Sequence, residues 1–247
     1  MKALRYLEPN KLEIQDIAKP SPKKNEVLLR VRSCGICGSD VHGYLGLTGR
    51  RTPPMTMGHE FSGEIVEVGA DVKSLKAGDR VAPYPVDFCE ECDMCKKGDF
   101  HLCKNKRQFG VLTVDGAFAE YICLPEKLCF RIADNVSFDV ASLMEPLAVA
   151  YHGVGRAGSL KDRTVLIVGA GTIGLLALAC IKMQKPSKIF VSDLSDFRLG
   201  MAKKMGADVL INSSKYELRQ IIDRETGGKG VDMAFEAVGA TASVKSA

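Results

Sequence analysis

Apolar and polar residues alternate with a period of two in several short stretches of the first half of the chain. The clearest stretch is 26–33, and the alternation recurs over 64–68 and 117–124. Successive side chains of a β-strand point to opposite faces of a sheet, so this period predicts half-buried strands. Shorter strands are predicted at 2–6, 12–17 and 79–82. Glycine and proline separate these segments, which predicts an antiparallel, barrel-like all-β domain.

The pattern changes after about Pro125. Residues 136–157 are rich in Ala, Leu and Val and predict a helix, interrupted at Glu145-Pro146 because proline disfavours helical backbone in the residue before it. Apolar runs typical of buried strands then alternate with helical segments, and these runs lie at 165–168, 188–192, 208–211 and 231–238. This alternation predicts an α/β domain with a parallel, doubly wound sheet.

We place the boundary between the two domains near Tyr151, so that the all-β domain covers 1–150 and the α/β domain covers 151–247. A doubly wound sheet usually has about six strands, more than the apolar runs of this domain supply. The second domain is therefore expected to be incomplete at its C-terminal end.

The composition is that of an ordinary globular protein. Of the 247 residues, 46% are apolar and 26% are charged, and the net charge of +4 comes from basic residues scattered along the sequence. Without a basic cluster there is no nucleic-acid footprint. No uncharged apolar run reaches the roughly 18 residues of a membrane span, and the first residues lack a signal-peptide core. We therefore expect a cytoplasmic protein that binds neither nucleic acid nor membranes.

Four of the nine cysteines fall within a short loop at 89–103, with the spacing Cys89-x2-Cys92-x2-Cys95-x7-Cys103. Clustered cysteines in a cytosolic protein more often bind metal than form disulfides. Four thiolates fill the tetrahedral shell of Zn²⁺ and leave no open position, which predicts a structural zinc. Two disulfides or four unliganded thiols are the alternatives. His101 lies in the same loop and is expected at the surface, because four sulfur atoms saturate the metal.

A glycine-rich turn, Gly169-x-Gly171-x-x-Gly174, follows a predicted strand and opens a helical segment, and Asp193 ends the next predicted strand. Gly169 permits a tight turn, Gly171 lets the backbone approach a pyrophosphate and Gly174 allows close packing of helix and strand. Asp193 would accept hydrogen bonds from ribose hydroxyls and repel a 2′-phosphate, so NAD is predicted over NADP. A plain strand-to-helix turn is the alternative. The predicted cofactor-binding residues are Gly169, Gly171, Thr172, Ile173, Gly174, Asp193 and Arg198.

The segment from Cys34 to Phe61 concentrates thiol, imidazole and carboxylate groups, the three kinds of side chain that bind Zn²⁺. A catalytic zinc takes three such ligands and keeps a fourth position open. Of the two cysteines we favour Cys37, because Cys34 still belongs to the end of a predicted strand. A redox function of this cysteine pair is the alternative. His59-Glu60 would supply an imidazole and a carboxylate, although spacing alone does not link them to Cys37.

Glu145 is a carboxylate in an otherwise apolar helical segment, Ala-Ser-Leu-Met-Glu-Pro-Leu-Ala-Val-Ala. Burial of such a charge is costly unless it is paired or bound to a cation. Glu145 is therefore a further candidate for a metal site.

Five motifs can now be read together: Cys-Gly-Ile-Cys-Gly-Ser-Asp-Val-His, Gly-His-Glu, the four-cysteine loop, Glu-Pro-Leu-Ala-Val-Ala and Gly-Ala-Gly-Thr-Ile-Gly. They resemble the zinc-dependent medium-chain dehydrogenases, in the branch that includes sorbitol, galactitol-1-phosphate, butanediol and threonine dehydrogenases. The resemblance implies a GroES-like N-terminal domain followed by a Rossmann dinucleotide-binding domain. It also implies that Cys37, His59 and either Glu60 or Glu145 hold a catalytic zinc, with Glu60 or a water completing the shell.

The resemblance further implies that Ser39 and His42 form a proton relay, with Glu60 also part of the catalytic site; a bypassed relay with His42 at the surface is the alternative. The implied reaction oxidises a polyol or polyol phosphate to a ketone, transfers hydride to NAD and uses two zinc ions per chain. Alternative substrates are 2,3-butanediol and L-threonine, and a zinc- and nucleotide-binding fragment without turnover is another alternative. The complete chain is expected to form a homo-dimer or tetramer. Arg50 and Arg51 could contact a substrate phosphate or form a solvated pair.

Overall fold

The computed structural model describes residues 1–112 and 114–247, which form two compact units. The first unit is Met1–Glu145 and the second is Pro146–Ala247. Each unit has its own hydrophobic core. The division lies a few residues before the boundary placed near Tyr151, close to the start of a helix that begins at Met144.

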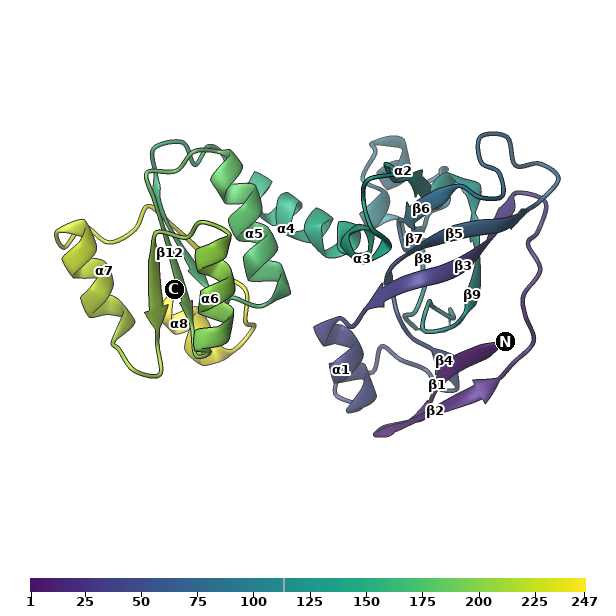
Figure 1. Cartoon of the computed structure of the whole chain (residues 1–247), viewed down its shortest axis with the longest axis horizontal. Coiled ribbons are helices and arrows are strands. Elements are labelled where there is room, and N and C mark those ends of the chain that lie inside the picture. The colour runs from purple at the N-terminus through teal and green to yellow at the C-terminus, as the bar shows by residue number, and fades with distance from the viewer. Residues whose placement is uncertain (113) are drawn as a thin grey trace. The chain divides into compact units, whose positions relative to one another are not determined.

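The first unit is built mainly from antiparallel strands (Figure 1). Its strands are β1 (Lys2–Glu8), β2 (Lys11–Asp16), β3 (Glu26–Gly35), β4 (Met55–Thr56), β5 (Glu60–Val68), β6 (Arg80–Pro83), β7 (Val86–Asp87), β8 (Arg107–Gln108), β9 (Tyr121–Pro125) and β10 (Cys129–Arg131). They form a five-stranded sheet of order β10-β6-β5-β3-β9, a three-stranded sheet of order β2-β1-β4 and the pair β7-β8. The helices are α1 (Gly38–Tyr44), α2 (Asp93–Lys96) and α3 (Phe138–Ser142), with single 3₁₀ turns at Phe100–Leu102 and Glu126–Leu128.

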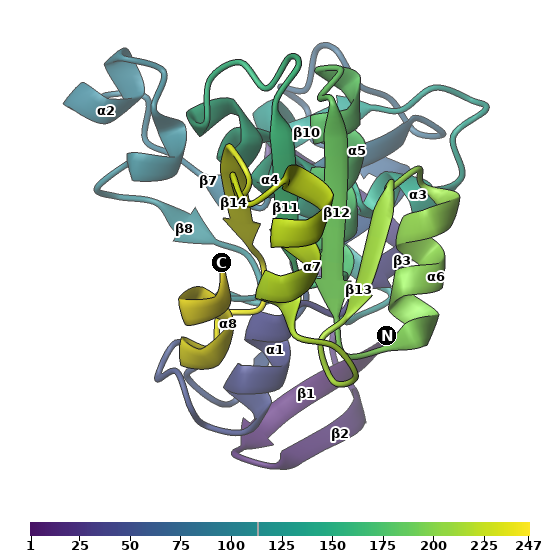
Figure 2. The same cartoon turned by 90° about the vertical axis from the view of Figure 1, so that its left-hand side faces the viewer.

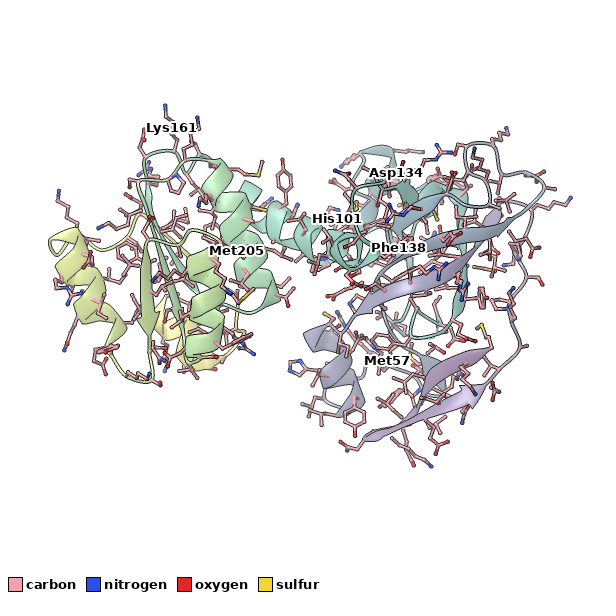
Figure 3. All side chains as sticks on the ribbon, in the orientation of Figure 1. Met57, His101, Asp134, Phe138, Lys161 and Met205 are labelled. Atoms are coloured by element: carbon pink, nitrogen blue, oxygen red, sulfur yellow. The ribbon has the colours of Figure 1, made fainter. Side chains whose placement is uncertain are left out.

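The two longest strands, β3 and β5, form the centre of the five-stranded sheet. Their alternating apolar side chains, among them Leu29 and Phe61, are buried in one core with Leu124 of β9. In the register of this pair, Gly35 at the end of β3 lies opposite Glu60 at the start of β5. The pairing therefore brings the two ends of the Cys34–Phe61 segment together. A smaller core under β1 and β4 contains Met57, which is labelled in Figure 3.

Helix α1 follows β3 directly, and the hydrophobic pattern does not predict it. Its seven residues include two glycines, Gly38 and Gly43, which are poor helix formers. Capping compensates for them. The Ser39 N–H donates to Cys37 Sγ at 3.5 Å, and the Cys37 N–H donates to Asp40 Oδ2 at 3.2 Å.

Helices α3 and α4 (Met144–Arg156) occupy the segment predicted as one interrupted helix. The break lies at Leu143, so the interruption predicted at Glu145-Pro146 is wrong. Pro146 belongs to the first turn of α4, where a missing N–H removes no helical hydrogen bond. Figure 3 labels Phe138 at the start of α3, where the Arg80 guanidinium lies 4.5 Å from the centre of its ring.

The second unit has strands β11 (Thr164–Val168), β12 (Lys188–Asp193), β13 (Val209–Asn212) and β14 (Met233–Glu236). They form the predicted parallel sheet, in the order β13-β12-β11-β14, and Figure 2 shows them side by side. The helices are α5 (Thr172–Met183), α6 (Asp196–Lys204), α7 (Leu218–Thr226) and α8 (Thr241–Ser246). In Figure 1, α5 and α6 cover one face of the sheet and α7 covers the other.

Each face of this sheet has a separate core. On one face Leu178 of α5 and Leu199 of α6 pack with Ile167 of β11. On the other, Ile222 of α7 packs with Phe190 of β12. Figure 3 labels Met205 just after α6, at the edge of the first core. Across the described ranges, none of the helices combines the length and the apolar character that crossing a bilayer requires.

Candidate functional site

The four cysteines of the 89–103 loop converge on one point. Cys89 Sγ lies 3.5 Å from Cys103 Sγ and 3.9 Å from Cys95 Sγ. Cys92 Sγ lies 3.6 Å from Cys95 Sγ. Sulfur atoms bound tetrahedrally to one Zn²⁺ at about 2.3 Å are about 3.8 Å apart. The observed separations therefore fit the edges of such a tetrahedron.

All nine cysteines of the chain are free thiols, so this loop contains neither of the two disulfides considered from the sequence. Hydrogen bonds from the backbone at Cys95 and Lys104 lower the pKa of Cys92 to about 6. Burial raises the pKa of Cys95 to about 12. A cluster that ionises one thiol below neutral pH is suited to bind a cation, which would displace the protons that remain.

A second group of metal-binding atoms comes from Cys37, His59 and Glu60, whose donor atoms lie within 4.8 Å of one another. Strand pairing assembles this group. Gly35 of β3 lies opposite Glu60 of β5, so Cys37, just beyond β3, meets His59, just before β5. Gly35 also leaves space for the carboxylate, because a Cβ at this position would lie 2.5 Å from Glu60 Oε2. The register of β3 and β5 therefore explains why Cys37 lies close to His59 and Glu60, which their spacing along the sequence does not.

Asp40, a buried residue of α1, lies behind this group. Its carboxylate accepts a hydrogen bond from Arg51 Nη2 at 2.9 Å, and its Oδ1 is 3.5 Å from His59 Nδ1. Burial raises the pKa of Asp40, but hydrogen bonds and charge from His59 and Arg51 outweigh burial and hold it below its usual value. The carboxylate is therefore ionised at neutral pH and can orient the His59 imidazole.

The charges around His59 favour a cation at this group. Burial lowers the pKa of His59, yet Asp40 and Cys37 raise it to about 10. His59 Nδ1 is buried and has no well-directed hydrogen-bond partner among the described residues. Negative groups that hold a proton this firmly also stabilise a divalent cation in its place. Thiol, imidazole and carboxylate therefore fit zinc in both chemistry and charge.

Glu145, from the start of α4, is not in the set of described residues whose donor atoms meet within 4.8 Å. It is nevertheless close enough for the charges of that set to affect it. Burial raises the pKa of Glu145, the His59 charge lowers it and the Glu60 charge raises it. The preceding helix α3 is tied to β5, because the Ser62 hydroxyl donates to the Phe138 carbonyl at 2.6 Å. Glu145 thus stands as a carboxylate beside the group.

Ser39 and His42 lie one turn apart on α1, and both are exposed. Ser39 Oγ accepts a hydrogen bond from Arg51 Nη2 at 3.2 Å. Arg51 is itself buried and paired with Asp40, so it is neither a solvated loop residue nor free to contact a substrate phosphate. Arg50 is exposed.

Cys34 lies at the end of β3, outside the metal-binding group. Its thiol donates to the Gly35 carbonyl at 3.7 Å, and burial raises its pKa to about 12. Both Cys34 and Cys37 are free thiols. Redox-active cysteines are typically exposed and have a lowered pKa, so Cys34 lacks the character that the redox alternative requires.

The glycine turn joins β11 to α5. Gly169 has a φ of +100°, a conformation that favours glycine, and its N–H donates to the Ser192 carbonyl at 2.7 Å. A Cβ at Gly174 would lie 1.8 Å from Gly169 O, so glycine is needed for the close approach of α5 to β11. A Cβ at Gly171 would meet nothing within 4 Å, which leaves open space at the helix start. The first N–H groups of α5, from Thr172 onward, are those of a helix N-terminus, which suits a phosphate.

Asp193, the last residue of β12, is buried. Its carboxylate accepts hydrogen bonds from the Ala170 N–H at 2.8 Å and the Ser195 N–H at 2.9 Å. Arg198 Nη1 lies 3.8 Å from Asp193 Oδ2. Asp193 therefore fixes the glycine turn, a role that sequence reasoning does not assign to it.

A pocket of about 600 Å³ opens beside Asp193 and Arg198. Gly169 of the glycine turn lines it, together with Val238 and Ala242 from the segment after β14. The pocket lies at the carboxyl ends of parallel strands, where doubly wound sheets bind nucleotides. Of the other predicted cofactor residues, Thr172, Ile173 and Gly174 form the first turn of α5.

Sequence reasoning assigns no role to Gly35, Asp40 or Gly43, and treats Arg51 only as a loop residue. Asp40 carries the one usable signal, since it lies three positions after Cys37 within a recognised motif. The two glycines and the arginine become informative only when the packing around them is known.

Two family models match the chain. The one described as "Alcohol dehydrogenase GroES-like domain" matches residues 23–134. The one described as "Zinc-binding dehydrogenase" matches residues 172–247. The two matches fall in the first and second structural units respectively.

Individual relatives match over almost the whole chain. An L-threonine 3-dehydrogenase of Symbiobacterium thermophilum is 37% identical over 99% of this chain and 70% of its own length. A sorbitol dehydrogenase of Bacillus subtilis is 38% identical over 100% of this chain and 71% of its own length. The crystal structure of galactitol-1-phosphate dehydrogenase from Escherichia coli matches with a TM-score of 0.91 and 32% identity, over 100% of this chain and 71% of that one.

Proposed function

The chain belongs to the zinc-dependent medium-chain dehydrogenases, and on this premise we propose that it oxidises a secondary alcohol of a polyol or polyol phosphate to the ketone, with NAD as hydride acceptor. The observation that carries the proposal is the convergence of Cys37, His59 and Glu60. A thiol, an imidazole and a carboxylate form a catalytic metal set that leaves a coordination position for substrate.

Cys37, His59 and Glu60 would hold the catalytic zinc, with Glu145 beside them as a second carboxylate. Zinc bound there would supply Lewis acidity, which favours loss of the proton from a substrate hydroxyl near neutral pH. Asp40, whose Oδ1 lies 3.5 Å from His59 Nδ1, would orient the imidazole of a metal-bound His59. The four cysteines of the 89–103 loop would hold a second, structural zinc.

The hydroxyl proton would leave through Ser39 and His42. Both are exposed on α1: Ser39 lies in the first turn, next to Cys37 at the N-cap, and His42 lies in the last turn. An imidazole titrates near neutral pH and can pass a proton to solvent, and a serine hydroxyl can accept one proton while donating another. The exposure of His42 also supports the alternative in which the relay bypasses it.

In the second unit, Gly169, Gly171 and Gly174 would let a pyrophosphate approach the N-terminus of α5, including the N–H groups of Thr172 and Ile173. Bound NAD would accept the hydride. Asp193 would receive the ribose hydroxyls, and its negative charge disfavours a 2′-phosphate. Arg198 lines the same pocket and pairs with Asp193.

The substrate class rests on the polyol names of the relatives, sorbitol in one and galactitol 1-phosphate in another. L-Threonine is the second candidate, because a relative of almost the same identity is an L-threonine 3-dehydrogenase. Both substrates carry a secondary alcohol. We also propose a homo-oligomer in the reducing cytoplasm, which the nine free thiols support.

The proposal is tested with zinc-loaded protein and NAD. We expect sorbitol, xylitol or galactitol 1-phosphate to give the absorbance of reduced cofactor, with butanediol and threonine as the comparison substrates. A chelator should abolish the reaction and zinc should restore it. Protein that carries both zinc ions and reduces NAD with none of these compounds would leave only a zinc- and nucleotide-binding function. Sedimentation of the same sample gives the oligomeric state.

A further inference from the structure

We propose that Arg51 is a positioning residue for this reaction: its buried guanidinium fixes the Ser39 hydroxyl in the arrangement that a proton relay needs, in a space that Gly43 keeps free. The inference rests on the proposed function, because it concerns the serine assigned to the relay.

The position of Arg51 is unusual for an arginine. Its side chain is only 3% exposed, and it lies between two residues of the same helix, α1. One nitrogen, Nη2, donates both to Asp40 Oδ1 at 2.9 Å and to Ser39 Oγ at 3.2 Å. The other, Nη1, donates to the Arg50 carbonyl at 3.3 Å. Burying a guanidinium is costly, and here the ion pair with the equally buried Asp40 offsets much of that cost.

Nη2 of Arg51 carries two N–H groups, and the acceptor of one of them is Ser39 Oγ. Nε is buried and has no hydrogen-bond partner among the described residues, while Nη2 has two acceptors. The arginine therefore keeps both hydrogen bonds of Nη2 although its Nε–H stays unpaired in the part of the chain that the structure describes. The geometry directs one nitrogen at the carboxylate behind His59 and at the hydroxyl of the relay.

The chemistry of this contact restricts what the Ser39 hydroxyl can do. A guanidinium only donates, so it occupies one of the two lone pairs of Ser39 Oγ. One lone pair and one hydrogen remain. A hydroxyl in that state can accept one proton and donate another, which is the requirement for a relay, and the adjacent positive charge stabilises oxygen as it releases its hydrogen. Without Arg51 the hydroxyl could rotate freely and occupy unproductive orientations.

Gly43 makes room for the arginine. A Cβ at Gly43 would lie 2.6 Å from Arg51 Cγ and 3.3 Å from Nε. The Cγ atom is near the base of the side chain and cannot move without moving the guanidinium. Gly43 is helical and has no positive φ, so alanine suits its backbone and should even favour the helix. Gly43→Ala therefore displaces Arg51 without removing any charge.

The experiment compares Arg51→Ala, Arg51→Lys and Gly43→Ala with Arg32→Ala as the matched control. Arg32 is an arginine of the same unit whose ion pair with Glu64 lies at the surface. For each zinc-loaded protein, kcat and KM are measured with NAD and the alcohol that the wild type turns over best. The absorption of Co²⁺ substituted at the Cys37 group reports on the metal ligands independently of activity. Guanidinium ion is then added to each variant.

We expect Arg51→Ala to lower kcat by about 10- to 100-fold, the usual effect of removing a group that supports a catalytic shell, with the KM for NAD unchanged. The Co²⁺ bands of Arg51→Ala should remain, and added guanidinium should restore part of kcat in this variant alone. Arg51→Lys should retain an intermediate rate, because lysine keeps the positive charge but lacks the planar, forked N–H donors of arginine. Gly43→Ala should lower kcat while the Co²⁺ bands remain, and Arg32→Ala should match the wild type.

Wild-type kcat in both Arg51→Ala and Gly43→Ala would overturn the inference and leave the proposed function intact. Loss of the Co²⁺ bands together with kcat would also overturn it, because Arg51 would then only hold the metal-binding loop in place. If Arg51→Ala does not fold, Gly43→Ala and Arg51→Lys decide by the same criteria. A zinc-loaded wild type without turnover on any of the alcohols would refute the proposed function, and this inference with it.

Discussion

The part of the chain that the structure describes contains two groups of residues suited to bind a metal, and these groups are built in opposite ways. The four cysteines come from one loop, and their sulfur atoms approach within 3.5–3.9 Å of one another. The group of Cys37, His59 and Glu60 draws its members from the ends of two paired strands and the start of a helix. A closed shell can be encoded by spacing along the chain. An open site depends on the register of a sheet.

The surroundings of the two groups differ as well. The cysteine cluster consists of four thiols and is uniform in chemistry. The mixed group has a buried ion pair behind it, Asp40 with Arg51, and a further carboxylate, Glu145, beside it. Supporting groups of this kind orient metal ligands and tune the reactivity of a bound metal, which favours the proposed catalytic role for the mixed group.

The largest expected effect comes from breaking the closed group. Cys103→Ser should remove one of two zinc ions per chain and unfold the 89–103 loop, because apparent binding energies of structural zinc reach about 10 kcal/mol or more. Metal analysis and thermal unfolding measure both effects. Cys123→Ser, at a thiol outside both groups, is the control and should keep two zinc ions. Retention of both zinc ions by Cys103→Ser would contradict a four-sulfur shell.

The second effect concerns the open group. His59→Ala should lose the other zinc and lower kcat about a thousandfold, since Lewis acidity contributes several kcal/mol to the barrier. The melting temperature should fall much less than in Cys103→Ser. Metal content, kcat and calorimetry should therefore show a large loss of activity with little loss of stability in His59→Ala, and a large loss of stability in Cys103→Ser. Similar loss of stability in both would remove the distinction between a structural and a catalytic site.

A smaller effect tests the strand register. Gly35→Ala would place a Cβ 2.5 Å from Glu60 Oε2 and force the carboxylate away from the metal. We expect zinc affinity at this group to fall about 10- to 100-fold, as for other disturbances of a metal shell. Gly38→Ala is the matched control, because a Cβ there meets nothing within 4 Å. Competition with a chelator measures the affinity, and equal affinities in the two variants would show that Glu60 is not a ligand.

The smallest effect, counted per pH unit, is the dependence of stability on pH. Against the effect of burial, Asp40 and Cys37 raise the pKa of His59 from 6.5 to about 10. Protonated His59 therefore stabilises the metal-free fold fully below pH 6.5, and this contribution is lost as the pH rises through about 10. The slope for one proton is at most about 1.4 kcal/mol per pH unit. Urea unfolding of chelator-treated protein should show the slope, and His59→Gln should flatten it; identical slopes would contradict the assigned charge.

The difference between local patterns and contacts made by folding also explains how far the sequence predicts the structure. Period-two alternation predicts β3 and β5, whose apolar residues Val27, Leu29, Phe61 and Ile65 pack in one core. The alternating strands and helices likewise predict the parallel sheet of the second unit, which the structure confirms. Helix α1 is not predicted, because its glycines oppose helix formation and its stability comes from Cys37 and Asp40 at its start. The predicted helix break at Glu145-Pro146 is wrong, because proline is tolerated in the first turn of a helix.

At the sites, the spacing of the four cysteines predicts a group that the structure does bring together. For the mixed group the candidate residues can be chosen from the sequence, but their convergence cannot. It follows from the pairing of Gly35 with Glu60, which is a property of the folded sheet. The roles of Arg51 and Gly43 cannot be predicted from the sequence either, because the contacts of Arg51 with two residues of α1 exist only in the folded chain.

The central claim is that one metal group is open to ligands and the other is closed. It is tested most directly by replacing zinc with Co²⁺ at each group in turn and adding imidazole, a small ligand for open metal positions. We predict that the absorption bands of Co²⁺ held by Cys37, His59 and Glu60 shift on addition, while those of Co²⁺ held by the four cysteines do not. A shift at the cysteine group, or none at the mixed group, would contradict the account.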